Sequence, residues 1–452
     1  MKKITSVTFR GHHSATMNTY ENIADSITES EDELERLEKK PLLRSSAKWT
    51  NRDLLFLFQW MLIKFGHGIE IYLPGVITQQ VSCEMGISKV REGILGVILY
   101  VFMALATFIS MPLAKKLGNK FVLYLSLYSS IIFAVVCAIV PNFWTLLLSR
   151  ALTGICVGLT AATSGVYFAQ NVSSVDIVPT GSFLQGFAIA LGSSWIAALG
   201  WLLLDVIDWR KFILCTSIPW FIPPIIILHC NIEVSDSKEN NTTSSKKEHF
   251  ETPTDFSLRV LKSSMFMGLS LVFGYGSILL VPQLMRANKK NNSLPSPDDQ
   301  DPCSNVVHGA EYLILAAISG GSQFFGRYFG FVLRKCIKFR VLQSAIGSLV
   351  VLGTAVIMFK PESWVQYACL GLAKMAYGMQ TTETLILQLD AEYFGSDGIA
   401  TSSTLMFTFA YMGAIGGVAF AAFFNPFTTT LLYVITSSLL VFVVLTMTGV
   451  QH

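Results

Sequence analysis

The chain has 452 residues, of which 52% are hydrophobic and only 14% are charged. The core of a soluble domain does not need this much apolar surface, so the composition predicts an integral membrane protein. The net charge of +3 does not indicate a nucleic-acid partner, and the eight cysteines lack the spacing of a metal site. The sequence shows neither a phosphate-binding glycine loop nor a nucleophile elbow, so we expect no enzyme activity, no metal and no cofactor.

A polar N-terminal tail, residues 1–53, precedes the first apolar segment and contains EDELERLEKKPLLRSS. Glu38 stands before Leu42 and Leu43 at the spacing of an acidic dileucine sorting signal, which makes a clathrin adaptor a candidate partner. The alternative is a short helix over 29–40 with a solvated charged face. The signal favours an endolysosomal or secretory-vesicle membrane over the plasma membrane.

Twelve apolar segments follow, and a spanning helix needs roughly 20 mostly apolar residues. A polar stretch at 231–258 separates two groups of six. The predicted fold is therefore an all-α membrane protein with an N-terminal six-helix bundle (54–230), a cytosolic linker and a C-terminal six-helix bundle (259–450). Two such halves predict a transporter with its binding site between them near the middle of the bilayer. The predicted spans are 54–77, 92–113, 121–140, 143–169, 181–205, 211–230, 260–282, 309–331, 340–359, 363–389, 399–424 and 428–449.

The lysines and arginines between the spans predict the orientation of the chain. They place the N-terminal tail and the linker in the cytosol. The opposite side then holds 78–91 and 283–308, with a glycosylation sequon at Asn291. Cys83 and Cys303 both face this oxidising side, where a disulfide between them can form. The basic residues that carry the argument are Lys115, Lys116, Lys120, Arg334, Lys335, Lys338 and Arg340.

Three ionisable residues, Lys64, His67 and Glu70, lie inside the first predicted span, 54–77. Their spacing keeps successive members near one helix face. Each charge costs about 2.5–3.5 kcal/mol in hydrocarbon, so we expect these side chains to face a partner or a polar cavity. Glu70 could carry a proton or bind a cation, or it could form a structural pair with Lys64 or another helix. His67 can change protonation near neutral pH or be a hydrogen-bonded core histidine, and Lys64 could snorkel or neutralise a carboxylate.

Several stretches carry a family resemblance. Together and in order they resemble the Major Facilitator Superfamily, and within it the group of synaptic vesicle glycoprotein 2 and related organic-ion transporters. The resemblance covers most of residues 54–449 and implies twelve helices in two halves. The stretches are FQWML (58–62), HGIEIYLPG (67–75), REGILGVILYVFM (91–103), SRALTGICVGL (149–159), DWRKFIL (208–214), FGYGSILLVPQL (273–284) and EYFGSD (392–397).

Some positions depart from the family pattern. Lys115 stands where an Asp is expected between the second and third helices, and Gln170 and Thr180 replace an acidic residue and an Arg. The Pro-Glu-Ser motif after the sixth helix is missing, and 283–308 is too short for the large lumenal domain of synaptic vesicle glycoprotein 2. These departures put the family's usual gating in doubt.

In proteins that resemble this chain, helices one, four, seven and ten line the central cavity. The resemblance therefore indicates Tyr275 in the seventh span and Tyr377 and Glu383 in the tenth as solute-binding residues, together with those of the first span. The alternative for Glu383 is a structural hydrogen bond between helices. Gln283 is a further expected cavity residue.

Arg150, Gly154 and Gly158 match the superfamily's fourth-helix pattern, and we expect structural or gating roles for them. Glycines at this spacing permit close contact between helices. Arg327 in the eighth span and Asp205 near the end of the fifth are expected to form an interface pair or to lie at the headgroups.

The sequence thus predicts a secondary membrane transporter of a small polar or charged organic solute that works by alternating access. Cations, anions and sugars all remain open as solutes. The alternative is a non-transporting vesicle membrane protein that acts in trafficking or as a receptor, because charges typical of the family are missing.

Overall fold

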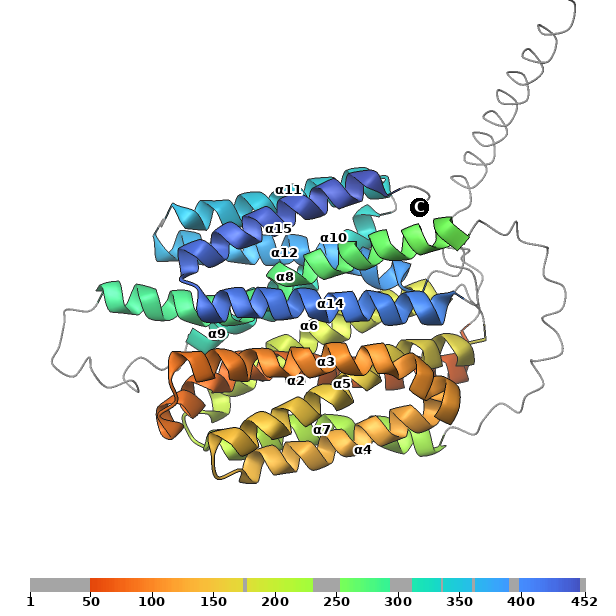
Figure 1. Ribbon diagram of the computed structural model, residues 1–452, viewed down its shortest axis with the longest axis horizontal. Helices are drawn as coiled ribbons and strands as arrows, with labels where there is room; N and C mark the ends of the chain where they lie inside the picture. The colour runs from red at the N-terminus through yellow and green to blue at the C-terminus, as the bar shows by residue number, and fades with distance from the viewer. Residues whose placement is uncertain are drawn as a thin grey trace, which may run out of the picture. The chain divides into compact units, whose positions relative to one another are not determined.

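The computed structural model describes residues 49–173, 177–230, 253–292, 311–334, 336–359, 362–389 and 398–447. Regular structure within these residues is helical throughout, and Figure 1 shows the long helices packed alongside one another. The sorting signal with Glu38, Leu42 and Leu43 lies outside the described residues. Cys303 and most of the predicted linker lie outside them as well.

The helices confirm the predicted fold class. Elements α9, η3 and α10 follow one another without a break and form one rod, so the described helices make twelve rods in all. Ten of the described helices are long and apolar enough to cross a membrane, and the α9–η3–α10 rod and α12 complete the set. The helices are α2 (Asn51–Met85), α3 (Lys89–Leu117), α4 (Asn119–Ile139), α5 (Phe143–Asn171), α6 (Val178–Leu203), α7 (Trp209–Cys230), α8 (Pro253–Asn292), α9 (Glu311–Ala316), the π-helical turn η3 (Ala317–Gly321), α10 (Ser322–Leu333), α11 (Phe339–Met358), α12 (Ser363–Leu387), α14 (Ile399–Phe423) and α15 (Pro426–Thr446).

Helix α2 is longer than the apolar pattern 54–77 predicts. Hydropathy reports only the segment that suits hydrocarbon, whereas the helical hydrogen bonds continue until capping residues end them. Thr50 forms a capping box with Asp53 at the start of α2, and Gly86, at φ 59°, ends the helix in the left-handed conformation. The apolar pattern therefore locates the span, and the capping residues locate the helix ends.

Helices pack both within and between the predicted halves. In the first half α2 contacts α5, α6 and α7, and α5 also contacts α3 and α4. In the second half α8 packs on α14 and α15, and α12 packs on α10 and α11. Helices α3 and α14 lie side by side across the halves (Figure 1), as do α6 and the α9–η3–α10 rod. Residues Ala47–Val450 form one compact unit, so the predicted boundary between two bundles stays a prediction.

Two glycines of α5 let its backbone approach that of α3. A Cβ atom at Gly158 would lie 2.5 Å from the carbonyl oxygen of Met103 and 2.9 Å from the Cβ of Ala106. Gly154 packs in the same way on the carbonyl oxygen of Leu99. This is the close contact that small residues permit between membrane helices.

We expect Gly158→Ala to destabilise the protein by about 1–3 kcal/mol, because the added methyl group has no room against α3. The matched control is Gly416→Ala in α14, where no described atom would lie within 4 Å of the new Cβ. There the substitution should be neutral or slightly stabilising. Apparent melting temperatures of the purified variants in detergent measure the difference, and equal values would contradict the assigned contact.

Candidate functional site

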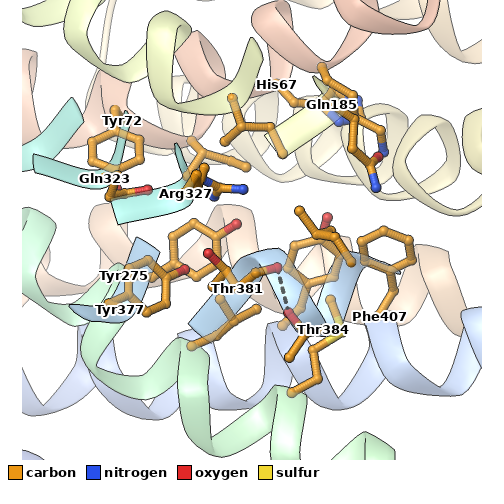
Figure 2. Close-up of a pocket in the computed structure, with 17 residues that line it drawn as sticks. His67, Tyr72, Gln185, Tyr275, Gln323, Arg327, Tyr377, Thr381, Thr384 and Phe407 are labelled. Carbon is orange, nitrogen blue, oxygen red and sulfur yellow. Dashed lines mark hydrogen bonds between the residues drawn. The ribbon is translucent and has the colours of Figure 1, made fainter. Parts of the chain in front are cut away.

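A cavity lies between helices of the two predicted halves, with walls from α2, α6, α8, α10, α12 and α14 (Figure 2). The centre of a water molecule can occupy about 40 Å³ of it, which is room for a few waters and not for an organic solute. The described residues that line it are Lys64, His67, Ile71, Tyr72, Gln185, Ile189, Met267, Leu271, Tyr275, Gln323, Arg327, Tyr377, Thr381, Thr384, Leu385, Phe407 and Tyr411.

Four of the residues expected to bind solute surround this cavity. Lys64 and His67 reach it from α2, Tyr275 from α8 and Tyr377 from α12. The backbone of Glu383 lies in α12, but its side chain is outside the described part of the chain. The structure thus brings together residues that lie about 300 positions apart in the sequence.

Glu70 lies away from the described cavity wall and pairs with Arg150 of α5. The Arg150 Nη1 donates to Glu70 Oε2 over 2.9 Å, and Nη2 donates to the Glu70 carbonyl oxygen over 3.2 Å. Both side chains are at most 3% exposed. A helix turns about 100° per residue, so Glu70 points about 120° away from Lys64. That rotation carries it from the cavity to α5, where it joins two helices of the first half.

Lys64 is buried and makes contacts within the protein. Its ammonium donates to the carbonyl oxygen of Ala161 over 3.2 Å and lies 5.2 Å from the ring centroid of Phe407. Phe407 belongs to α14, so Lys64 reaches from α2 into the second half. Next to it, the Nε2 of His67 has no hydrogen-bond partner among the described residues.

The Tyr72 hydroxyl joins α2 to the second half. It accepts hydrogen bonds from the Gln323 amide and, over 3.3 Å, from the Lys374 ammonium. Lys374 also donates to the Gly274 carbonyl oxygen, and its side chain is fully buried. Aromatic rings of Tyr72, Phe273 and Tyr377 surround the ammonium at 5.3–5.9 Å from their centroids. Sequence reasoning missed Tyr72 and Gln323, because both side chains are neutral at physiological pH and so place no charge within an apolar span to mark them.

Arg327 of α10 is the main cavity residue that sequence reasoning placed elsewhere. Its side chain is 3% exposed, and its Nε and Nη1 have no hydrogen-bond partner among the described residues. Figure 2 shows its guanidinium between the layer with His67 and Gln185 and the layer with Tyr275 and Tyr377. A charge within an apolar span was the available signal. The sequence alone did not show which face of the helix Arg327 occupies.

The turn η3 precedes this arginine in the α9–η3–α10 rod. It is a π-helical turn immediately before α10, and such turns are frequent at functional sites. Gly320 within η3 packs on Ser194 of α6, so the rod approaches the first half closely at this point. The close approach brings Arg327 against Gly186 of α6, where an added Cβ would meet Nη1.

Other predicted residues lie outside the cavity. Gln283 donates to the Ala421 carbonyl oxygen over 2.6 Å and so joins α8 to α14. Cys83 is disulfide-bonded; its predicted partner Cys303 lies outside the described residues. Asn291 lies in the last turn of α8, and its side chain is not described. Asp205 is exposed after the end of α6.

Breaking the Glu70–Arg150 pair should destabilise the protein strongly. Glu70→Gln leaves the buried guanidinium without a counter-charge, which costs about 3–5 kcal/mol. The double variant Glu70→Gln/Arg150→Gln removes both charges and should recover much of the loss. Thermal unfolding in detergent measures both effects.

The same helix offers a matched control in Glu84→Gln. Glu84 pairs with Arg210 at 2.5 Å, but it is 46% exposed, and exposed pairs contribute about 0–1 kcal/mol. A double Glu70/Arg150 variant no more stable than Glu70→Gln would show that the pair's charges do not act together.

The cavity walls combine cations, hydroxyl groups and apolar side chains. Lys64 and Arg327 are the charged side chains among the described lining residues. Tyr275, Tyr377 and Tyr411 add hydroxyl groups, which can donate or accept hydrogen bonds. The wall thus offers hydrogen-bonding groups beside apolar surface, an arrangement that suits binding of a polar solute.

The family model described as Major Facilitator Superfamily matches residues 60–421. Among curated relatives, synaptic vesicle glycoprotein 2A of Rattus norvegicus is 27% identical over 158 residues, which are 34% of this chain and 21% of the relative. Synaptic vesicle glycoprotein 2B of Homo sapiens is 28% identical over 158 residues, 34% of this chain and 23% of the relative. The matched part thus spans about a fifth of the length of these relatives.

Solved structures share the fold. The xylose transporter XylE from E. coli, in a partially occluded inward open conformation, has a TM-score of 0.66 and 12% identity, over 87% of this chain and 98% of that chain. The proton:xylose symporter XylE bound to 6-bromo-6-deoxy-D-glucose has a TM-score of 0.65 and 13% identity, over 86% of this chain and 94% of that chain. At these identities the likeness concerns the fold alone.

Proposed function

The chain belongs to the Major Facilitator Superfamily, and on this basis we propose that it is a secondary transporter that moves a small polar or charged organic solute by alternating access. The observation that carries the proposal is the cavity between α2 and α6 on one side and α8, α10, α12 and α14 on the other, whose mainly apolar wall holds several polar side chains. Both predicted halves contribute side chains to it. A solute held there would contact both halves at once.

Contacts between the halves close the cavity along α2 in both directions. Toward the end of α2, an added Cβ at Gly75 would lie 2.6 Å from the side chain of Ile278 in α8. Near the start of α2, the neighbouring helix α5 makes the corresponding contact. An added Cβ at Gly165 of α5 would lie 3.7 Å from the side chain of Leu389, which follows α12. Alternating access requires one of these contacts to open while the other stays closed. Both are made by small and apolar residues, which can separate without leaving a buried charge unpaired.

Filling the cavity should abolish transport. Thr384 is buried in the cavity wall, so Thr384→Trp places a bulky ring where the solute would lie. The matched control is Leu372→Trp on the same helix, because Leu372 is 60% exposed and points away from the core. We expect at least a tenfold loss of uptake in Thr384→Trp and little change in Leu372→Trp.

Uptake is measured in proteoliposomes with radiolabelled sugars, organic cations, organic anions and nucleosides. Thermal unfolding of each variant confirms that it is folded. Wild-type protein that is folded yet takes up none of these classes would contradict the transporter proposal. So would equal uptake by Thr384→Trp and wild type.

The protein is a multi-pass membrane protein, and we propose a vesicle membrane as its location. The similarity to synaptic vesicle glycoproteins and the predicted dileucine signal in the N-terminal tail support this proposal. Leu42→Ala/Leu43→Ala should shift a fluorescently tagged protein from vesicles to the cell surface, because the adaptor contact is lost. Microscopy against a surface marker tests this, and an unchanged distribution would remove the sorting signal from the proposal.

A further inference from the structure

We propose that the solute is an organic anion whose negative group binds Arg327 and whose body lies against the aromatic wall of the cavity. This inference deepens the proposed function and rests on it. It depends on three observations: the sign of the charges in the wall, the hydrogen-bonding groups left without partners, and the apolar surface opposite them.

The charges in the described wall are positive. Lys64 and Arg327 line the cavity, and Lys374 lies directly behind the rings of Tyr72 and Tyr377. The described side chains of the wall include no carboxylate, since Glu70 is held by Arg150 outside it. A solute with a negative charge would offset this positive surface, whereas a cation would add to the repulsion.

The fully buried hydrogen-bonding atoms of the described wall that lack a partner are all nitrogens. They are the Nε and Nη1 of Arg327, the Nε2 of Gln185 and the Nε2 of His67. A guanidinium can only donate, so the Arg327 atoms require an acceptor whichever way the neighbouring amide is turned. Leaving such a buried charged donor unpaired is costly, and the oxygens of an anion are strong acceptors for it. The site therefore fits an anionic oxygen group between Arg327 and Gln185.

The position of these donors also joins the two predicted halves. Gln185 and Gly186 belong to α6, and the Nη1 of Arg327 from α10 reaches the backbone of Gly186. An anion bound here would contact donors from both halves at once. The same contact that selects the anion would thus favour the closed arrangement of the halves around it.

The rest of the wall is apolar and aromatic. Phe407 and Tyr411 stack with ring centroids 6.0 Å apart, and Tyr275 packs against Tyr100 at 5.4 Å. Met267 and Leu271 of α8 complete this side. The occupant that suits both surfaces is a small anion with an apolar or aromatic body, such as an arylalkyl carboxylate.

The test uses three probes that share one carbon skeleton: phenylacetate, phenylacetamide and phenethylamine. Binding to the purified full-length protein is measured by thermal shift and isothermal titration. We expect phenylacetate to bind at least tenfold more tightly than the amide and the amine. Phenylmethanesulfonate and phenyl phosphate, measured in parallel, show whether a planar or a tetrahedral anionic group fits better.

Arg327→Gln should weaken phenylacetate binding at least tenfold, and Arg327→Lys should restore part of the affinity because it keeps the charge. Arg91→Gln is the matched control, since Arg91 is exposed at the start of α3. Gln185→Leu provides a second test should Arg327→Gln not fold. It should weaken phenylacetate binding several-fold while leaving the charge of the wall unchanged.

Different failures separate the two proposals. If wild type bound phenethylamine more tightly than phenylacetate, and Glu383→Gln lost this binding, the proposal of an anionic solute would be overturned and a cation transporter would remain. Preference for a neutral sugar, unaffected by Arg327→Gln, would overturn the anion in the same way. Folded protein that neither binds nor takes up any solute class would overturn the transporter and the anion together.

Discussion

Charged side chains buried among membrane helices must find their partners inside the protein, and this constraint organises the structure. Glu70 and Arg150 satisfy each other between α2 and α5. Lys64 and Lys374 donate to backbone carbonyl oxygens of Ala161 and Gly274. Each of these contacts ties two helices together, because an isolated charge in hydrocarbon costs about 2.5–3.5 kcal/mol on insertion scales. Among the described wall residues, Arg327 is the charged group with nitrogens that still lack a partner. The constraint therefore separates the charges that hold helices together from the one whose nitrogens lack a partner among the described residues.

The contacts between the halves differ in kind along the cavity. Tyr72 carries a polar link from α2 to Gln323 and Lys374. Between α3 and α14 the link is a hydroxyl pair, with the Oγ1 atoms of Thr107 and Thr408 3.2 Å apart. The neutral hydrogen bonds, between Tyr72 and Gln323 and between Thr107 and Thr408, contribute about 0.5–1.5 kcal/mol each, so they can break and reform during a conformational cycle.

Two positions that depart from the family's charge pattern, Lys115 and Gln170, lie near helix ends. Lys115 is exposed near the end of α3, and Gln170 near the end of α5 accepts a hydrogen bond of 2.9 Å from Asn119. A neutral side-chain pair thus joins the start of α4 to the end of α5. The hydropathy pattern predicted the helices, because burial in a bilayer leaves a signal in every span. It also predicted Lys64 and His67 as polar residues of the first span. It did not predict the partner of Glu70 or the direction of Arg327, because both depend on how neighbouring helices are rotated about their axes.

The sign of the wall charge also bears on how the cavity closes. Bringing α6 and α10 together places the Arg327 guanidinium beside Gly186, within a wall that also holds Gln185 and Lys64. Positive groups in a narrowing, poorly hydrated space repel more strongly as water leaves, because the effective dielectric constant falls. An anion between them would reverse the sign of that interaction and so favour closure around the solute. A ligand shifts a conformational equilibrium only through its differential affinity for the two states. In this protein that differential affinity would come from donors on both halves, which meet a single anionic group only when the cavity is closed.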